Sequence, residues 1–394
     1  MQALAALLEK ARCGDAAAFC EIARQHEEVL FRQACALCLD SHSAEDLVQE
    51  TLLEAWKCIA RYDGSCRFST WLYAILLHRW QKSRRKWCAV RAFAMIPPDL
   101  DLFVLDPAKM PPDEQAKKAV DAYSPALKLL AQGAGIKPCD WGIDFSVEGP
   151  QTLLPQLSKA GQLSRGACFA ARYEWATGHK AKAVEHLRNA VIMGRHVGAG
   201  KDGTLISILA QTAIEQRVIG VCAEHLADAD AAAALEPVIK LGNVAGRHLA
   251  SEAVLGEKKL IRPGLAAGMM ILLADPTAKD YDEMARVLAL PYEQSQTEMK
   301  ALAASIDAKP NPFSKAMLRS ISRTYEQQMT LDAKWAMLDA AIAICKTGPD
   351  ALKDAKNPLG TGPFQYKKLD AGFELSTTMP GDGKPIVLTF GKPQ

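Results

Sequence analysis

The sequence predicts a mainly α-helical protein that ends in a small antiparallel β meander. Residues 1–90 contain no proline and repeat apolar residues at helical spacing, and then five prolines fall between Pro97 and Pro112. Helical spacing returns from Asp113 to Lys346, and the tail changes to an alternating pattern. We therefore expect a helical domain over 1–92, a proline-rich linker over 93–112, a larger helical domain over 113–350 and the meander over 351–394.

The composition is that of a folded globular protein, because 49% of the 394 residues are hydrophobic and 23% are charged. The net charge of +2 hides a basic segment, since no acidic residue occurs between Asp63 and Asp99. Such a local cluster favours contact with a polyanion more than the overall charge does. Its seven basic residues are Arg67, Arg79, Lys82, Arg84, Arg85, Lys86 and Arg91.

The cysteines and the apolar segments indicate a cytoplasmic protein without a membrane partner. Eleven cysteines at irregular spacing are not a disulfide framework, so a reducing compartment is expected. The first ten residues lack the features of a signal peptide. The apolar run 265–274 is too short to span a bilayer, and 205–221 carries Glu215 and Arg217, as a buried helix of a globular protein can.

Three residues at close spacing could be metal ligands: Cys35, Cys38 and His42. However, no second pair of cysteines supplies the remaining ligand at zinc-finger spacing. Both cysteines lie on a helix expected to pack a core, where free cysteines are commonly buried. We therefore expect neither a metal nor a cofactor.

The segment 43–56 predicts a helix with two distinct faces. Ser43 with Asp46 matches a capping box, so the helix is expected to begin there. A stripe at helical spacing predicts the buried face: Leu47, Thr51, Leu52, Ala55 and Ile59. The other face carries Asp46, Gln49, Glu50, Leu53 and Lys57. That face could be a simple solvated surface or a docking surface.

A loop over 62–67 leads to a second helix, for which Ser69 or Thr70 is a plausible N-cap. Its expected buried stripe is Phe68, Leu72, Ile75 and Leu76. His78, Lys82, Arg85 and Lys86 lie on a different face. These cations could bind DNA, or they could simply suit a helix C-terminus through the helix dipole.

Further along the chain, 163–177 and 180–197 predict an antiparallel helix pair around Gly178. Small residues at its interface would allow close packing: Ala170, Ala171, Ala183 and Ala190. The pair is similar to a tetratricopeptide hairpin, but no second copy follows at a 34-residue offset, which favours a non-repeating domain. In the tail, alternating runs at 364–367, 373–376 and 386–390, separated by turn residues, predict the three strands of the meander.

Several motifs of the first ninety residues occur together at family spacing. The run "GDAAAF…AEDLVQETLLEAW…RYDG…RFSTWLYAILLHRWQKSRRK" strongly resembles region 2 of the extracytoplasmic-function (ECF) group of the sigma-70 family. The likeness extends from Leu7 to about Lys86 and implies a helical bundle that acts in transcription initiation.

The resemblance also implies roles for the two helices. One set of residues would dock on the coiled coil of the largest subunit of RNA polymerase: Asp46, Gln49, Glu50 and Leu53. The other set would hold promoter DNA and a base flipped from the −10 element: Tyr62, Arg67, Phe68, Thr70, Trp71, His78, Arg79, Lys82, Arg84, Arg85 and Lys86. Stacking on aromatic side chains such as Tyr73 returns part of the cost of flipping, and Trp71 could equally be core. His78 replaces a frequent asparagine, and the family often has an acidic residue near Lys82, so the base preference is open.

The chain departs from the family after residue 112, because no helix-turn-helix sequence for reading the −35 element follows. The segment 153–178 and the tail loosely resemble helical proteins of planctomycete-like bacteria, which implies no activity. No phosphate loop or hydrolase motif occurs, so we do not expect an enzyme.

We expect a sigma-factor-like protein that binds core RNA polymerase and the −10 element, with a protein or small ligand as a further partner at 113–394. The alternative is an interaction or sensor protein that uses the sigma-like part as a docking device or retains it as a fusion vestige.

Overall fold

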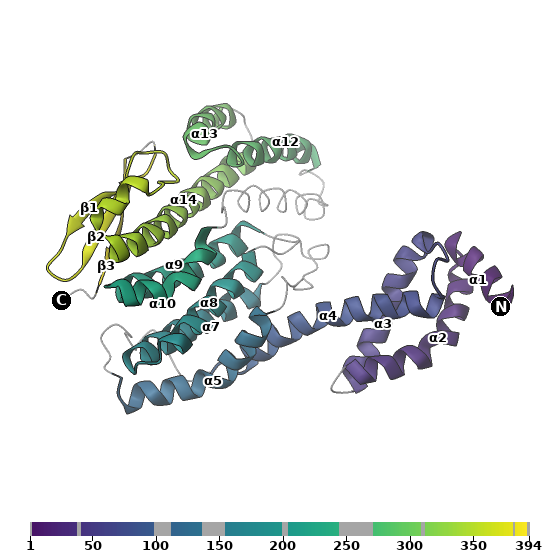
Figure 1. Cartoon of the computed structure of the whole chain (residues 1–394). Coiled ribbons are helices and arrows are strands. Elements are labelled where there is room, and N and C mark those ends of the chain that lie inside the picture. The colour runs from purple at the N-terminus through teal and green to yellow at the C-terminus, as the bar shows by residue number, and fades with distance from the viewer. Residues whose placement is uncertain are drawn as a thin grey trace. The chain divides into compact units, whose positions relative to one another are not determined.

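The computed structural model describes residues 2–37, 41–97, 112–135, 154–198, 204–243, 271–308, 312–380 and 383–391. Their contacts divide the chain into unit 1, Met1–Trp87, and unit 2, Cys88–Gln394. The described part is mainly helical and ends in a three-stranded antiparallel sheet, which confirms the predicted fold class (Figure 1).

Unit 1 is a small helical bundle. Gly14 turns the chain with a φ of +92°, and Asp15 then caps the next helix by accepting hydrogen bonds from the backbone N–H groups of Ala17 and Ala18. Trp80 Nε1 donates to the backbone oxygen of Leu37 at 2.8 Å. The elements are α1 (Gln2–Arg12), α2 (Ala16–Leu37), α3 (Ser41–Cys58), the 3-10 helix η1 (Ile59–Arg61) and the first part of α4 (Phe68–Ala94).

Helix α3 begins at Ser41, two residues before the start that the capping box predicted. The side chains of residues 41–43 lie outside the described part, so the capping bond of Ser43 is not among the described contacts. The end of α4 belongs to unit 2, because Ala92, Phe93 and Ile96 are buried in the core of that unit. Packed residues therefore extend into the segment 93–112 that we predicted as a linker, of which the structure describes 93–97 and 112.

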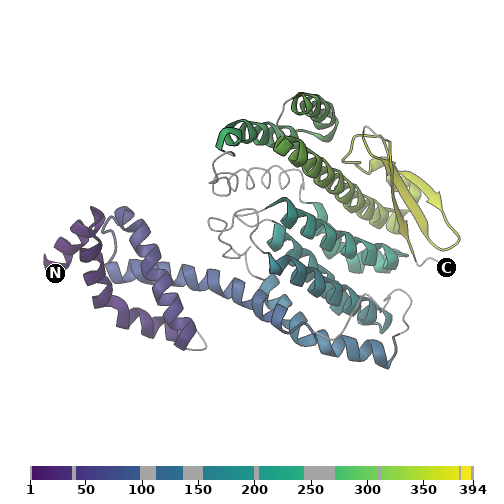
Figure 2. The same cartoon turned by 180° about the vertical axis from the view of Figure 1, so that it is seen from behind.

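Unit 2 consists of packed helices that end in the sheet (Figure 2). The predicted helix pair is confirmed as α7 and α8, and the four alanines named for its interface are all fully buried. The helices are α5 (Glu114–Ala134), α7 (Pro155–Ala176), α8 (Lys180–Gly198), α9 (Leu205–His225), α10 (Ala229–Ile239), η3 (Lys240–Asn243), α12 (Ile271–Leu288), α13 (Tyr292–Asp307), α14 (Pro312–Thr347) and η5 (Pro349–Asp354).

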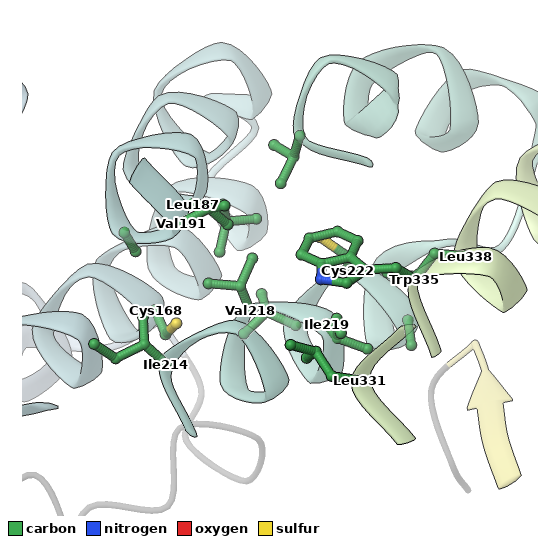
Figure 3. Close-up of a cluster of buried hydrophobic side chains, with 14 of the residues drawn as sticks. Cys168, Leu187, Val191, Ile214, Val218, Ile219, Cys222, Leu331, Trp335 and Leu338 are labelled. Atoms are coloured by element: carbon green, nitrogen blue, oxygen red, sulfur yellow. The ribbon is translucent and has the colours of Figure 1, made fainter. Parts of the chain in front are cut away.

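Helix α9 lies in the middle of unit 2, packed on α7, α8 and α14. Figure 3 shows its Val218 and Ile219 among side chains of these neighbours, such as Leu187 of α8 and Trp335 of α14. By length and composition α9 could cross a membrane, but 61% of its apolar stretch is buried in the structure. The prediction of a buried helix over 205–221 is therefore confirmed.

A buried carboxylate holds three of these elements together. Glu215 of α9 accepts hydrogen bonds from Gln211 Nε2 at 2.8 Å and from Trp335 Nε1 at 2.7 Å, and its other partner is Arg195 Nε of α8 at 3.3 Å. Arg195 also donates to the backbone oxygen of Leu241. The side chain of Glu215 is 3% exposed, so these partners replace the water that a carboxylate needs.

The tail forms the predicted meander in the order β1 (Gln365–Lys368), β2 (Phe373–Thr378) and β3 (Pro385–Phe390). Alternate residues of β2 and β3 are buried, and Phe373 stacks on Phe390 with ring centroids 4.8 Å apart. The backbone N–H of Gly391 donates to the oxygen of Ala223 at 3.1 Å, which joins the sheet to α9. The meander therefore shares its core with the helices of unit 2.

Candidate nucleic-acid interface

Helix α3 of unit 1 has the two faces that its sequence predicts. Leu47, Thr51 and Ala55 are buried, and Thr51 donates its hydroxyl to the backbone oxygen of Leu47 at 2.7 Å. On the opposite side Asp46, Gln49, Glu50, Leu53 and Lys57 are all exposed. We call these five residues the α3 stripe.

Leu53 is the unusual member of the α3 stripe, because this apolar side chain is 61% exposed among polar neighbours. A single exposed leucine is common on protein surfaces. Here it is flanked by charged and amide groups along a helix, an arrangement that suits a partner with a polar surface and a small apolar pocket.

Arg79 of α4 lies against α3 instead of projecting freely. Its Nη2 is 3.4 Å from Glu50 Oε2 and its Nη1 is 4.0 Å from Glu54 Oε2, and its side chain is only 21% exposed. Arg79 is among the predicted DNA contacts, and in this structure its charge faces two carboxylates. It links the helix of the α3 stripe to the helix that carries the basic cluster.

The loop that joins η1 to α4 is held by its own side chains. Tyr62 donates its hydroxyl to the backbone oxygen of Cys66 at 2.6 Å, and the backbone N–H of Ser65 donates to Asp63 Oδ1 at 3.0 Å. The second hydrogen bond keeps the pKa of the Asp63 carboxyl below its usual value. Gly64 sits between them with a φ of +77°, which favours glycine. These two hydrogen bonds and the turn at Gly64 hold the shape of the loop.

Three aromatic rings pack beneath this loop. Tyr62, Phe68 and Trp71 have ring centroids 5.2 to 5.5 Å apart. Tyr62 and Phe68 are buried, with 7% and 4% exposure, and His26 of α2 meets the Phe68 ring edge-on at 5.3 Å. Tyr62 and Phe68 belong to the predicted DNA contacts, but in this structure both rings pack against neighbouring side chains. They support the loop from below, and Trp71 is half-buried beside them.

Other predicted DNA contacts are accessible. Arg67, Thr70 and His78 are exposed, and Tyr73 is 37% exposed on the same helix. The side chains of Lys82, Arg84, Arg85 and Lys86 lie outside the described residues, although their backbone is part of α4. The loop and the first turns of α4 therefore present a cation, a hydroxyl and an aromatic ring to a ligand, next to the packed rings of Tyr62, Phe68 and Trp71.

The described residues do not support a metal site formed by the three possible ligands near the end of α2. Cys35 is exposed, which corrects the expectation that it packs the core. Cys38 and the side chain of His42 lie outside the described residues. Within the part of the chain that the structure describes, no group of three or more His, Cys, Asp or Glu residues could hold a metal ion.

A comparison with protein families identifies this part of the chain. Residues 22–87 match the family model of sigma-70 region 2. The match ends at the last residue of unit 1 and includes α3, the loop and the start of α4. Sigma region 2 domains generally bind core RNA polymerase and the promoter −10 element, and the domain itself is non-catalytic.

A curated relative is also similar to this chain. The RNA polymerase sigma factor NccH of Alcaligenes xylosoxydans xylosoxydans is 30% identical over 80 residues. The aligned part makes up 20% of this chain and 43% of NccH, so the chain spans less than half of that relative's length. No solved structure matches the chain. The region 2 domain suggests a sigma-factor-like role, and this assignment applies to residues 22–87.

Proposed function

We propose that the chain is a sigma-factor-like initiation protein that acts in the cytoplasm. Its region 2 domain binds core RNA polymerase through the α3 stripe. It captures the −10 element with the loop 62–67, the start of α4 and a basic cluster that consists of Lys82, Arg84, Arg85 and Lys86. The observation that carries this proposal is the exposed α3 stripe on a domain whose sequence matches the region 2 family model over residues 22–87.

The geometry supports different roles for different residues of the domain. Asp46, Gln49 and Leu53 project to solvent and are free to meet the coiled coil of the largest polymerase subunit. Arg67, Thr70 and Tyr73 lie beside the pre-shaped loop, where a flipped base could be held by a hydrogen bond and by stacking. Tyr62, Phe68 and Arg79 act indirectly, since the first two support the loop and the third joins α4 to α3.

The proposal gives unit 2 a role other than reading the −35 element. Region 2 contacts few bases, and each correct contact is typically worth about 1–3 kcal/mol, which is little discrimination among the sites of a genome. Unit 2 therefore supplies regulation or further selectivity by binding a protein or a small ligand.

The docking surface can be tested with the full chain and purified core RNA polymerase. We expect the substitution Asp46→Ala with Gln49→Ala to reduce co-purification at least tenfold, because both side chains are exposed and the substitutions leave the buried face of α3 intact. The matched control is Glu27→Ala with Glu28→Ala, two exposed residues of α2, which should bind like the parent. If the α3 double variant also binds like the parent, the docking assignment is wrong.

A further inference from the structure

A pocket of about 400 Å³ lies between the end of α13 and the first turns of α14, in unit 2. Its walls are Ala303 and Asp307 of α13 and six residues of α14: Lys315, Leu318, Arg319, Ser322, Arg323 and Glu326. The volume is in the range of sites for small molecules.

The α14 wall of this pocket carries a row of cations. Lys315, Arg319 and Arg323 follow at steps of four residues, so they lie above one another on a single helix face. Like charges at this spacing destabilise a helix, and a cation in the first turn, here Lys315, is also unfavourable to the helix dipole. The stability of α14 therefore does not explain why these three residues stand together.

The two arginines are available to a ligand. Both are exposed, and neither forms a hydrogen bond or ion pair with any residue that the structure describes. Lys315 donates from Nζ to the backbone oxygen of Asp307 at 2.7 Å, which fixes one side of the pocket. Ser322 adds a hydroxyl to the pocket lining.

The charges and the lining of the pocket indicate the class of ligand that it can bind. Three cations and the carboxylates of Asp307 and Glu326 sum to a net charge of +1, so a dianion gains more here than a monoanion. Arginine presents paired donors that match phosphate oxygens. Ala303 and the small accessible part of Leu318, which is 6% exposed, add an apolar wall. We propose that this pocket binds a small phosphate monoester through Arg319 and Arg323, with the apolar part of the ligand against Leu318.

Calorimetric titration of the full chain tests this site with two probes, inorganic phosphate and phenyl phosphate. We expect phenyl phosphate to bind more tightly than phosphate, because only its ring can cover Leu318. The variant Arg319→Gln with Arg323→Gln should bind phenyl phosphate at least tenfold more weakly than the parent. The variant Arg319→Lys with Arg323→Lys should show an intermediate loss of affinity, because lysine keeps the charge without the paired donors. The control Arg188→Gln, at an exposed arginine of α8, should change affinity less than twofold.

Three results would overturn the proposal. The first is no heat with either probe up to about 10 mM, a range that would detect even weak binding. The second is equal binding by the parent and the Arg319→Gln, Arg323→Gln variant. The third is a chain that binds a single-stranded oligonucleotide but not phenyl phosphate, and that loses this binding in the same variant. That result would make the row of cations a nucleic-acid surface. Circular dichroism of each variant checks that α14 still folds, and none of these readouts depends on polymerase.

Discussion

Replacing Glu215 by alanine is expected to destabilise unit 2 by about 3–5 kcal/mol, the largest stability effect of any substitution considered for this chain. The carboxylate accepts hydrogen bonds from Gln211 and Trp335 and pairs with Arg195. Its removal leaves the charge of Arg195 and the N–H donors of the other two side chains with little access to water. Gly242 makes the arrangement possible, because a side chain there would collide with the Trp335 ring.

Urea unfolding followed by the fluorescence of the full chain measures this loss. The transition of unit 2 should move to a clearly lower urea concentration in Glu215→Ala, and Glu215→Gln should lie between it and the parent, because the amide keeps an acceptor oxygen. Glu185→Ala, at an exposed glutamate of α8, is the control and should change stability by less than about 0.5 kcal/mol. A Glu215→Ala variant as stable as its control would mean that the network contributes little.

Replacing Arg84, Arg85 and Lys86 by alanine is expected to give the largest loss of DNA affinity. Each phosphate contact adds about 0.7 to 0.9 to the slope of log affinity against log salt, so three lost contacts should flatten that slope by about 2–3. The loss should be similar for all sequences, since phosphate contacts carry no sequence information directly.

Fluorescence anisotropy with single-stranded −10 DNA at several salt concentrations distinguishes the loss of these phosphate contacts from a general effect of removing positive charge. The matched control replaces Lys117, Lys118 and Lys128, three exposed lysines of α5 in unit 2, by alanine. The control should keep the slope of the parent. A slope that does not change in the Arg84, Arg85 and Lys86 variant would remove the cluster from the DNA interface.

Features set by nearby residues could be predicted from the sequence. The alternation at 373–376 and 386–390 is a local signal, and the strands and their antiparallel order follow the prediction. The two faces of α3 are equally local, since residues three or four apart share a face of a helix. These signals do not require knowledge of the rest of the fold.

Features that depend on distant residues could not be predicted in this way. Tyr62 and Phe68 look alike in the sequence whether they contact DNA or support a loop, and the sequence does not show that they are buried against Trp71 and His26. Glu215 interrupts an apolar helix, but its partner Trp335 is 120 residues further along the chain. The row of cations on α14 likewise becomes a pocket only through the packing of α13.

We propose that this chain directs RNA polymerase to open promoter DNA at the −10 element. The most direct measurement is permanganate footprinting, which detects unpaired thymines, on a promoter with core polymerase and the full chain. We predict unpaired thymines around −10 that require the chain, and no sequence-dependent protection near −35 that it provides. Polymerase binding without any open complex would contradict the claim and would favour a docking role for the region 2 domain.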